Sequence, residues 1–177
     1  ETRGIDDNGT REIKLLDGRL TSRLMGTYLL RSRYTTPGTN DQWETSLNRY
    51  GSNDKVSFRN IIRATSTYET AKFTHTLSAS YRNGYTDKEQ TADDCAVIVA
   101  GSPGECYGIQ LEVPSYTTFD FQTAYRPLKN VEITGGILNL FDRNPPFTLR
   151  NTGSHQVGYN PSYSSALGRQ FYLSGSY

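Results

Sequence analysis

Residues 168–177 constrain the fold of this chain more than any other stretch. From Phe171 onward every second residue is apolar or small, with polar residues between them, so a strand here has one apolar and one polar face. The stretch ends on an aromatic residue, Tyr177, whereas the last residues of most domains fray. A strand that ends on an interfacial aromatic ring is typical of the last strand of a transmembrane β-barrel. The alternative is a soluble sheet whose last strand closes the chain.

The composition favours strands and turns over helices. The 177 residues include 13 Tyr, 7 Phe and 16 Gly, but one Met and one Trp. A net charge of +1 gives no support for nucleic-acid binding. No apolar run reaches the roughly 20 residues of a membrane helix, but alternating barrel strands average out to a polar composition. Because no signal peptide or start-like segment is visible, we expect a mature or cleaved piece of a longer protein.

Alternating segments predict seven strands. The first is the weakest, either one bent strand or two short ones, because Asp7 interrupts its apolar face. The expected strands are 1–16, 19–34, 55–68, 73–83, 115–126, 131–142 and 168–177. Tight turns are expected at Asp17-Gly18, Glu69–Lys72 and Pro127–Asn130, and long polar loops at 35–54, 84–114 and 143–167.

The lengths and connections of these segments predict the fold class. Most predicted strands are longer than the roughly 5–6 residues that are usual in soluble sandwiches. Short turns at one end and long loops at the other are typical of membrane barrels. Single-chain bacterial barrels have even strand numbers, and seven strands cannot close without an unsatisfied edge in lipid. We therefore expect an all-β antiparallel meander of about seven long strands, with residues 1–177 forming the C-terminal segment of a single transmembrane barrel domain.

Several motifs resemble TonB-dependent outer-membrane receptors, and they follow in matching order along the whole chain. They are Glu1–Asp6, Pro114–Asp120, Asn139–Phe147, Gly158–Tyr163 and Gly168–Leu173. The resemblance implies a barrel of about 22 strands around a plug domain, of which this chain supplies the last seven. The plug and the earlier strands then belong to a separate fragment, a second polypeptide or a missing part of the same chain.

The resemblance also implies a function. A barrel-wall segment of a TonB-dependent transporter takes part in active uptake of a scarce nutrient, for which a ferric siderophore is the leading expectation. The implied partners are the rest of the barrel, the plug, the TonB complex acting through the plug, outer-membrane lipids and the barrel assembly machinery. The implied location is the bacterial outer membrane, with the loops extracellular and the C-terminus periplasmic. Phe171, Leu173 and Tyr177 resemble the signal that the assembly machinery reads.

No enzymatic constellation is visible, and no cofactor is expected. His75 and His155 lie in different predicted elements, so a metal site is not predicted. Serines and carboxylates show neither a nucleophile elbow nor paired-acid spacing. Gly135-Gly136 is no phosphate loop, because no helix start follows, and close packing or a kink within a strand is the better interpretation.

The two cysteines lie in the second long loop. Cys95 and Cys106 bracket a short segment, and an exposed loop on an oxidising surface favours a disulfide, with two free thiols as the alternative. Inside this segment, the apolar run 96–100 predicts either a short hairpin or a ligand-contacting tip.

Strand alternation places an excess of arginines on the inner face, against Asp120 and Glu132. These arginines are Arg23, Arg31, Arg33, Arg59, Arg63, Arg82 and Arg126. Their partner is either an acidic plug surface or an anionic ligand attracted by a positive field. Candidate ligand or plug contacts are Arg31, Arg33, Arg82, Arg59 and Arg63, with Tyr85 and Trp43 as loop aromatics that either stack on a ligand or pack within the loops.

Two other classes of function are considered. A passive porin-like channel would lack a plug, and the motifs at Asn139–Phe147 and Gly158–Leu173 speak against it. A soluble all-β binding module is disfavoured by the strand lengths and by the asymmetry of the loops.

Overall fold

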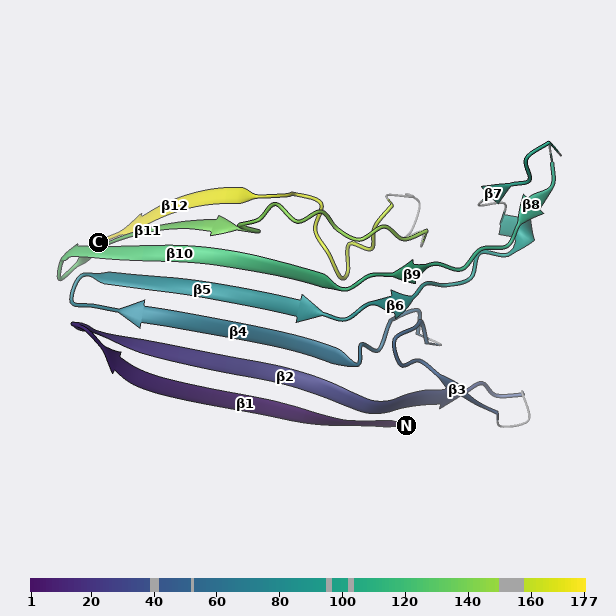
Figure 1. The fold of residues 1–177 in the computed structure, drawn as a ribbon, viewed down its shortest axis with the longest axis horizontal. Helices are drawn as coiled ribbons and strands as arrows, with labels where there is room; N and C mark the ends of the chain where they lie inside the picture. Colours follow the sequence, from purple (N-terminus) through teal and green to yellow (C-terminus); the bar gives the residue numbers. More distant parts are fainter. Residues whose placement is uncertain (39–41, 52, 95–96, 102–103, 150–157) are drawn as a thin grey trace.

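The computed structural model describes the chain except residues 39–41, 52, 95–96, 102–103 and 150–157. Seven long strands form an antiparallel meander in which sheet neighbours follow one another along the chain (Figure 1). They are β1 (Thr2–Leu15), β2 (Gly18–Thr35), β4 (Asn60–Glu69), β5 (Phe73–Arg82), β10 (Tyr116–Leu128), β11 (Val131–Leu138) and β12 (Gln170–Ser176). The predicted fold class, an all-β meander of seven long strands, is confirmed.

Short strands and one 3₁₀ turn lie in the long connections at one end of the sheet. Tight turns and the C-terminus lie at the left end of Figure 1, and the long connections extend from the right end. The short strands form small pairs: β3 (Trp43–Thr45) on β2, β6 (Tyr85–Thr86) with β9 (Glu112–Val113), and β7 (Val97–Ile98) with β8 (Cys106–Tyr107); η1 (Ala92–Asp94) is a 3₁₀ turn. The β7–β8 pair confirms the short hairpin among the two interpretations of the apolar run.

Strand register gives the sheet an apolar face and a polar face. Paired residues of an antiparallel ladder point to the same side, so a row of partners can be followed across all seven strands. One apolar-face row is Arg11, Ser22, Ser66, Leu77, Phe121, Ile137 and Phe171. One polar-face row is Glu12, Thr21, Thr67, Thr76, Gln122, Gly136 and Tyr172. The alternation expected from the sequence is therefore kept from strand to strand.

The first strand is continuous, with one irregularity. A register shift between Arg3 and Gly4 is the only interruption along the β1–β2 ladder. Asp7 pairs with Gly26 and lies on the apolar face, as its place in the alternation predicts. The alternative of two short strands is therefore wrong, and the polar residue is accommodated without breaking the ladder.

The first tight turn lies one residue earlier than predicted. Leu15 pairs with Gly18, so the two turn residues are Leu16 and Asp17 rather than Asp17 and Gly18. Leu16 has a φ of 53°, a left-handed conformation that non-glycine residues rarely adopt. The Tyr68 hydroxyl oxygen lies 3.2 Å from the Leu15 carbonyl oxygen and 3.1 Å from Asp17 Oδ1, so its one proton is shared between two acceptors of the turn and ties the turn to β4.

β4 and β11 start or end differently from the prediction because side chains redirect the backbone at their loop ends. Asn48 Oδ1 accepts the Arg59 N–H at 2.8 Å, so β4 begins at Asn60 and residues before it join the loops. β11 ends at Leu138 rather than at 142, because Asn139 and Asp142 have φ values of 52° and 54°. The Arg143 N–H donates to Asn139 Oδ1 at 2.8 Å and closes this turn.

The glycine pair of β11 explains how the last three strands fit together. A Cβ on Gly136 would lie 2.3 Å from the Tyr172 ring, which covers this glycine on the polar face. The Tyr172 hydroxyl continues across β11 and donates to Gln122 Oε1 on β10 at 3.0 Å. Gly135 points to the other face, where an added Cβ would meet the nearest atom, on Leu173, at an ordinary 3.7 Å. Close packing within a strand is therefore confirmed for Gly136.

Substituting the two glycines separately tests this packing. Gly136→Ala should lower the free energy of unfolding by about 1–3 kcal/mol, because the ring of Tyr172 must move. The matched Gly135→Ala change should be near neutral or slightly stabilising. The added Cβ would meet Leu173 at an ordinary contact distance, and alanine lowers the conformational entropy of the unfolded chain. Urea unfolding of the full-length protein in lipid vesicles measures both. Equal effects of the two substitutions would contradict the role of Tyr172.

Candidate ligand-binding site

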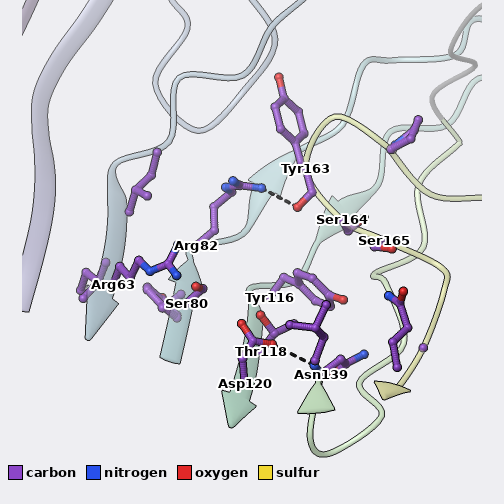
Figure 2. A pocket seen from close by; sticks show the side chains of 17 residues that line it. Arg63, Ser80, Arg82, Tyr116, Thr118, Asp120, Asn139, Tyr163, Ser164 and Ser165 are labelled. Carbon is purple, nitrogen blue, oxygen red and sulfur yellow. Dashed lines mark hydrogen bonds between the residues drawn. The ribbon is translucent and has the colours of Figure 1, made fainter. Parts of the chain in front are cut away.

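A cavity of about 610 Å³ lies on the polar face of the sheet, at the end where the long loops begin (Figure 2). Its wall comes from the loop ends of β4, β5, β10 and β11, which bring Arg63, Ser80, Arg82, Tyr116, Thr118, Asp120 and Asn139 together. Its roof comes from the segment 158–169, here called the strap, through Pro161, Tyr163, Ser164, Ser165 and Gly168. The cavity therefore joins the barrel-like wall to a loop from the far end of the chain.

Arg82 connects the wall to the strap. One Nη1–H donates to the carbonyl oxygen of Tyr163, as the dashed line in Figure 2 marks. The guanidinium carbon lies 5.0 Å from the centroid of the Phe58 ring and 5.5 Å from that of Tyr163. Its Nε is buried and has no hydrogen-bond partner among the described residues. Arg82 is thus a partly buried cation that no described carboxylate neutralises.

Arg63 supplies a second cation to the same cavity. Arg63 pairs with Ser80 and Ile61 pairs with Arg82, so the two arginines are diagonal neighbours on one face of β4 and β5. The Arg63 side chain is exposed, and no hydrogen bond or ion pair joins it to the described part of the chain. Diagonal positions are about 7–8 Å apart, which long side chains can bridge.

The acidic residue of the cavity is engaged elsewhere. Asp120 Oδ1 accepts the backbone N–H of Asn139 at 2.9 Å, a bond drawn in Figure 2. This bond ties the loop end of β10 to the turn that ends β11. No ion pair joins Asp120 to Arg63 or Arg82 within the described residues. The cavity therefore carries a local excess of positive charge from β4 and β5.

The strap is held at several points along its length. Asn160 is buried and its amide donates to the Tyr50 hydroxyl at 2.8 Å. The Val56 N–H donates to the Tyr163 hydroxyl at 2.8 Å, and the Arg169 N–H donates to Asp142 Oδ1 at 2.8 Å. These bonds place the roof over the cavity by contacts to the connection between β2 and β4 and to the turn that follows β11.

A small core supports the strap from the loop side. It consists of buried Val56, Phe58, Tyr85 and Val113, against which Tyr50 and Tyr163 pack. Tyr85 meets Tyr50 and Phe58 edge-on, at centroid distances of 5.8 and 5.6 Å. Burial raises the pKa of the Tyr85 and Tyr50 hydroxyls above the usual tyrosine value, so both stay protonated. The loops pack on one another instead of lying independently over the sheet.

A buried carboxylate links two of these loops. Asp87 is 2% exposed, and its Oδ2 accepts the Leu149 N–H at 2.9 Å together with the Thr148 hydroxyl. Its Oδ1 accepts the Lys88 N–H at 2.9 Å. These bonds connect the loop 84–114 to the loop 143–167. Removing a buried acceptor would leave its donors without partners, which is costly.

Several candidate contacts lie away from the cavity. Arg31 and Arg33 form ion pairs with Glu1, and the Arg33 guanidinium lies 4.4 Å from the centroid of the exposed Trp43 ring. Tyr85, at 5% exposure, packs in the loop core and is not displayed to a ligand in this conformation. A direct ligand or plug contact by Arg31, Arg33 and Trp43 stays a prediction.

The predicted inward direction of Arg59 is wrong. Its guanidinium lies 5.8 Å from the ring centroid of Tyr28, whose register places it on the apolar face. The physical reason is the late start of β4: alternation holds only within a strand, and Arg59 precedes it. The preceding residue, Phe58, packs against Arg82 beside the cavity.

Part of the predicted excess of cations on the inner face is balanced by carboxylates of the same chain. At the turn end of the sheet Arg126 pairs with Glu132 at 2.6 Å, and Arg19 pairs with Glu69 at 2.9 Å. Arg23 donates to the side-chain oxygen of Asn8 at 3.1 Å. The turn end is therefore compensated within the chain, while Arg63 and Arg82 at the loop end are not.

One half of the predicted disulfide, Cys95, lies outside the described residues. Cys106 lies in β8 and pairs in register with Ile98 of β7. The Cys95–Cys106 bridge stays a prediction. His155 also lies outside the described residues, and the remaining residues contain no group of three or more His, Cys, Asp or Glu side chains placed to hold a metal ion.

Two of the predicted assembly residues lie on the edge strand β12, and the third, Tyr177, directly follows it. Phe171, Leu173 and Tyr177 are 72%, 79% and 106% exposed, and the first two belong to the apolar face. Their role in assembly stays a prediction. Among the described residues, no helix is long and apolar enough to cross a membrane.

Sequence reasoning did not assign roles to several residues of the site. Asn139 and Tyr163 belong to motifs that carry the resemblance, which marked both positions without assigning them a contact. Tyr116 likewise lies in the motif Pro114–Asp120. Asp87 had no such signal, because its partners Thr148 and Leu149 come from a loop that only the tertiary fold brings near.

A comparison with solved structures matches the ferric enterobactin receptor of Pseudomonas aeruginosa, in a crystal structure of a mutant form. The TM-score is 0.53 at 19% sequence identity, and the match covers 95% of this chain and 21% of that chain. Comparisons with protein-family models and with curated proteins found no match. The likeness establishes the fold, a barrel-like sheet similar to that of a TonB-dependent receptor, and this chain spans about a fifth of that receptor's length.

Replacing Asp87 tests the link between the loops. Asp87→Asn leaves a buried donor facing Leu149 N–H or Thr148, at a cost of about 1–3 kcal/mol. Amide hydrogen exchange at 147–149 should then become about tenfold faster or more. Asp54→Asn is the matched control, because its 3.4 Å ion pair with Lys88 is exposed and worth at most about 1 kcal/mol. Unchanged exchange in the Asp87 variant would contradict the link.

Proposed function

We propose that this chain is a barrel-wall segment of a TonB-dependent outer-membrane transporter that takes up an anionic iron complex, most specifically a ferric siderophore. The supporting observation is the seven-strand meander that resembles a ferric enterobactin receptor over 95% of the chain. The cavity at the loop end, with its two uncompensated arginines, adds a place where a ligand of negative charge is attracted.

The proposal assigns an orientation to the sheet. The tight turns face the periplasm and the long loops face the outside of the cell, following the asymmetry of known bacterial barrels. The apolar face, with rows such as Leu77, Phe121 and Ile137, contacts lipid, and the polar face lines the lumen. In this orientation the cavity lies at the outer end of the lumen, where a ligand first meets the barrel.

The proposed partners follow from the surfaces of the sheet. β1 and β12 are the ends of the sheet order, and each offers an edge to further strands of a complete barrel. A plug domain fills the lumen and the TonB complex acts through it. Phe171, Leu173 and Tyr177 are proposed to be read by the barrel assembly machinery.

Energy-dependent uptake tests the transport function. Cells that express the full-length protein as their sole receptor should accumulate radiolabelled ferric enterobactin, and accumulation should fall to background when TonB is removed. Ferric complexes with other siderophore classes, tested in parallel, define the ligand. Passive entry of small solutes that is independent of TonB would contradict the proposal and indicate a porin-like channel.

Shortening the C-terminus tests the assembly signal. Deleting Tyr177 should lower the amount of folded, heat-modifiable protein in the outer membrane, because the terminal ring is removed from the exposed edge strand. Tyr177→Phe keeps the ring and should insert normally. Semi-native gels of boiled and unboiled membranes measure both. Normal insertion of the deletion variant would contradict the role of Tyr177.

A further inference from the structure

A group of polar side chains crosses the apolar face of the sheet near the tight turns. These residues, here called the polar band, are Arg11 on β1, Ser22 on β2, Ser66 on β4, His75 on β5 and Thr123 on β10. Arg11, Ser22 and Ser66 are register partners, and His75 is the partner of Thr123. Ser66 pairs with Leu77, and His75 is the next residue on the same face of β5, so the two parts of the band are diagonal neighbours.

The polar band keeps hydrogen-bonding capacity that the described chain does not use. The Ser22 and Ser66 hydroxyl oxygens lie 3.0 Å apart, and one of their two protons stays free for a further acceptor. His75 Nδ1 lies 3.0 Å from the Thr123 hydroxyl oxygen, while Nε2 has no hydrogen bond to a described residue. Arg11 is exposed, and no hydrogen bond or ion pair joins its guanidinium to the described residues. The band therefore offers donors, one of them charged, on a mostly apolar face.

Four rings that are nearly parallel to one another lie across this part of the face. Phe73 stacks on Tyr125 with ring centroids 4.7 Å apart and on His75 at 5.8 Å, and His75 stacks on Phe121 at 6.4 Å. The interplanar angles are 20°, 6° and 9°. Phe73 opens β5 directly after its turn, so the ladder runs from the turn end through the polar band. Aromatic rings at strand ends mark the membrane interface of β-barrels.

The depth of the polar band favours a lipid headgroup as its neighbour. Arg11 lies four residues before Leu15, the last residue of β1, which is about 14 Å along a strand. A long side chain at this depth can extend its guanidinium to the headgroups. A lipid-facing charge is costly at the centre of the hydrocarbon layer and nearly neutral close to its edge. Acyl chains alone would leave these donors without acceptors, whereas a headgroup supplies them.

We propose that the polar band and the ring ladder form a binding site for one anionic phospholipid. Arg11 binds the phosphate, the serine pair and His75 donate to phosphate or ester oxygens, and the rings contact the first methylene groups of the acyl chains. A net negative headgroup is preferred, because Lys72 and Lys129 in the neighbouring turns also have no carboxylate partner among the described residues. The site rests on the proposed function for its depth, which assumes that the turns face the periplasm.

Native mass spectrometry of the full-length protein in detergent tests the site. Phosphatidylglycerol is the probe, and phosphatidylcholine with the same acyl chains is the control. Phosphatidylglycerol should bind about fivefold more tightly than phosphatidylcholine, because it carries a net charge beside an unpaired arginine. A photoreactive phosphatidylglycerol should label the peptides that contain Arg11, Ser22, Ser66 or His75.

Matched substitutions separate the charge from the ring ladder. Arg11→Gln should weaken phosphatidylglycerol binding about fivefold and leave phosphatidylcholine binding unchanged. Lys14→Gln removes a cation from the same strand but from the polar face, and should change neither affinity. His75→Phe keeps the stacked ring and removes the N–H, so it should weaken both lipids by about threefold. Heat-modifiability on gels verifies that each variant is folded.

Three outcomes would overturn the inference. The first is equal affinity for the two lipids, and the second is unchanged phosphatidylglycerol binding by the Arg11 variant. The third is a native mass of two copies without bound lipid, which would assign this face to a second copy of the chain. None of these measurements involves a ferric ligand or TonB, so the lipid site can fail while transport stands, and transport can fail while the lipid site stands.

Discussion

Backbone hydrogen bonding between consecutive strands is the constraint on which the rest of this structure depends. Each long strand pairs with its neighbour in the chain, so every side chain is assigned to one of two faces by its place in the ladder. A shift of one residue would exchange the side chains of the apolar face and the polar face along a whole strand. Features that pin the register, such as the Tyr172 ring over Gly136 and the Tyr68 hydroxyl on the first turn, therefore preserve both faces at once.

Alternation predicted the strands well, because period two is a local property of the sequence. The prediction failed where contacts from distant residues, or left-handed backbone conformations, determine where a strand begins or ends. Residues 55–59 alternate, yet Asn48 draws the Arg59 backbone into the loops, and the predicted direction of Arg59 is lost with it. Asn139 and Asp142 end β11 through left-handed conformations that an apolar pattern does not reveal. The cavity itself was beyond prediction, because Tyr163 reaches Arg82 across 81 positions of sequence.

The distribution of charge distinguishes the two ends of the polar face. At the turn end, Arg126 and Arg19 have carboxylate partners, so that part of the wall is satisfied by the chain itself. At the loop end, Arg63 and Arg82 have no carboxylate partner among the described residues. A sequence-based count treats all inner arginines alike, whereas the structure separates those with a carboxylate partner from those that have none among the described residues. Positive charge without a carboxylate partner therefore remains at the loop end of β4 and β5.

The contacts that build the loop layer have a consequence for the order of folding. The Asp87–Thr148, Val56–Tyr163 and Tyr50–Asn160 bonds join residues 61, 107 and 110 positions apart. The tight hairpins β1–β2, β4–β5 and β10–β11 close only short loops, so their entropy of closure is small by comparison. The hairpins can therefore form locally, while the long-range bonds become favourable only after aligned strands have brought their ends together. The layer that encloses the cavity therefore forms last and opens first, so the loops can rearrange while the strands beneath them stay paired.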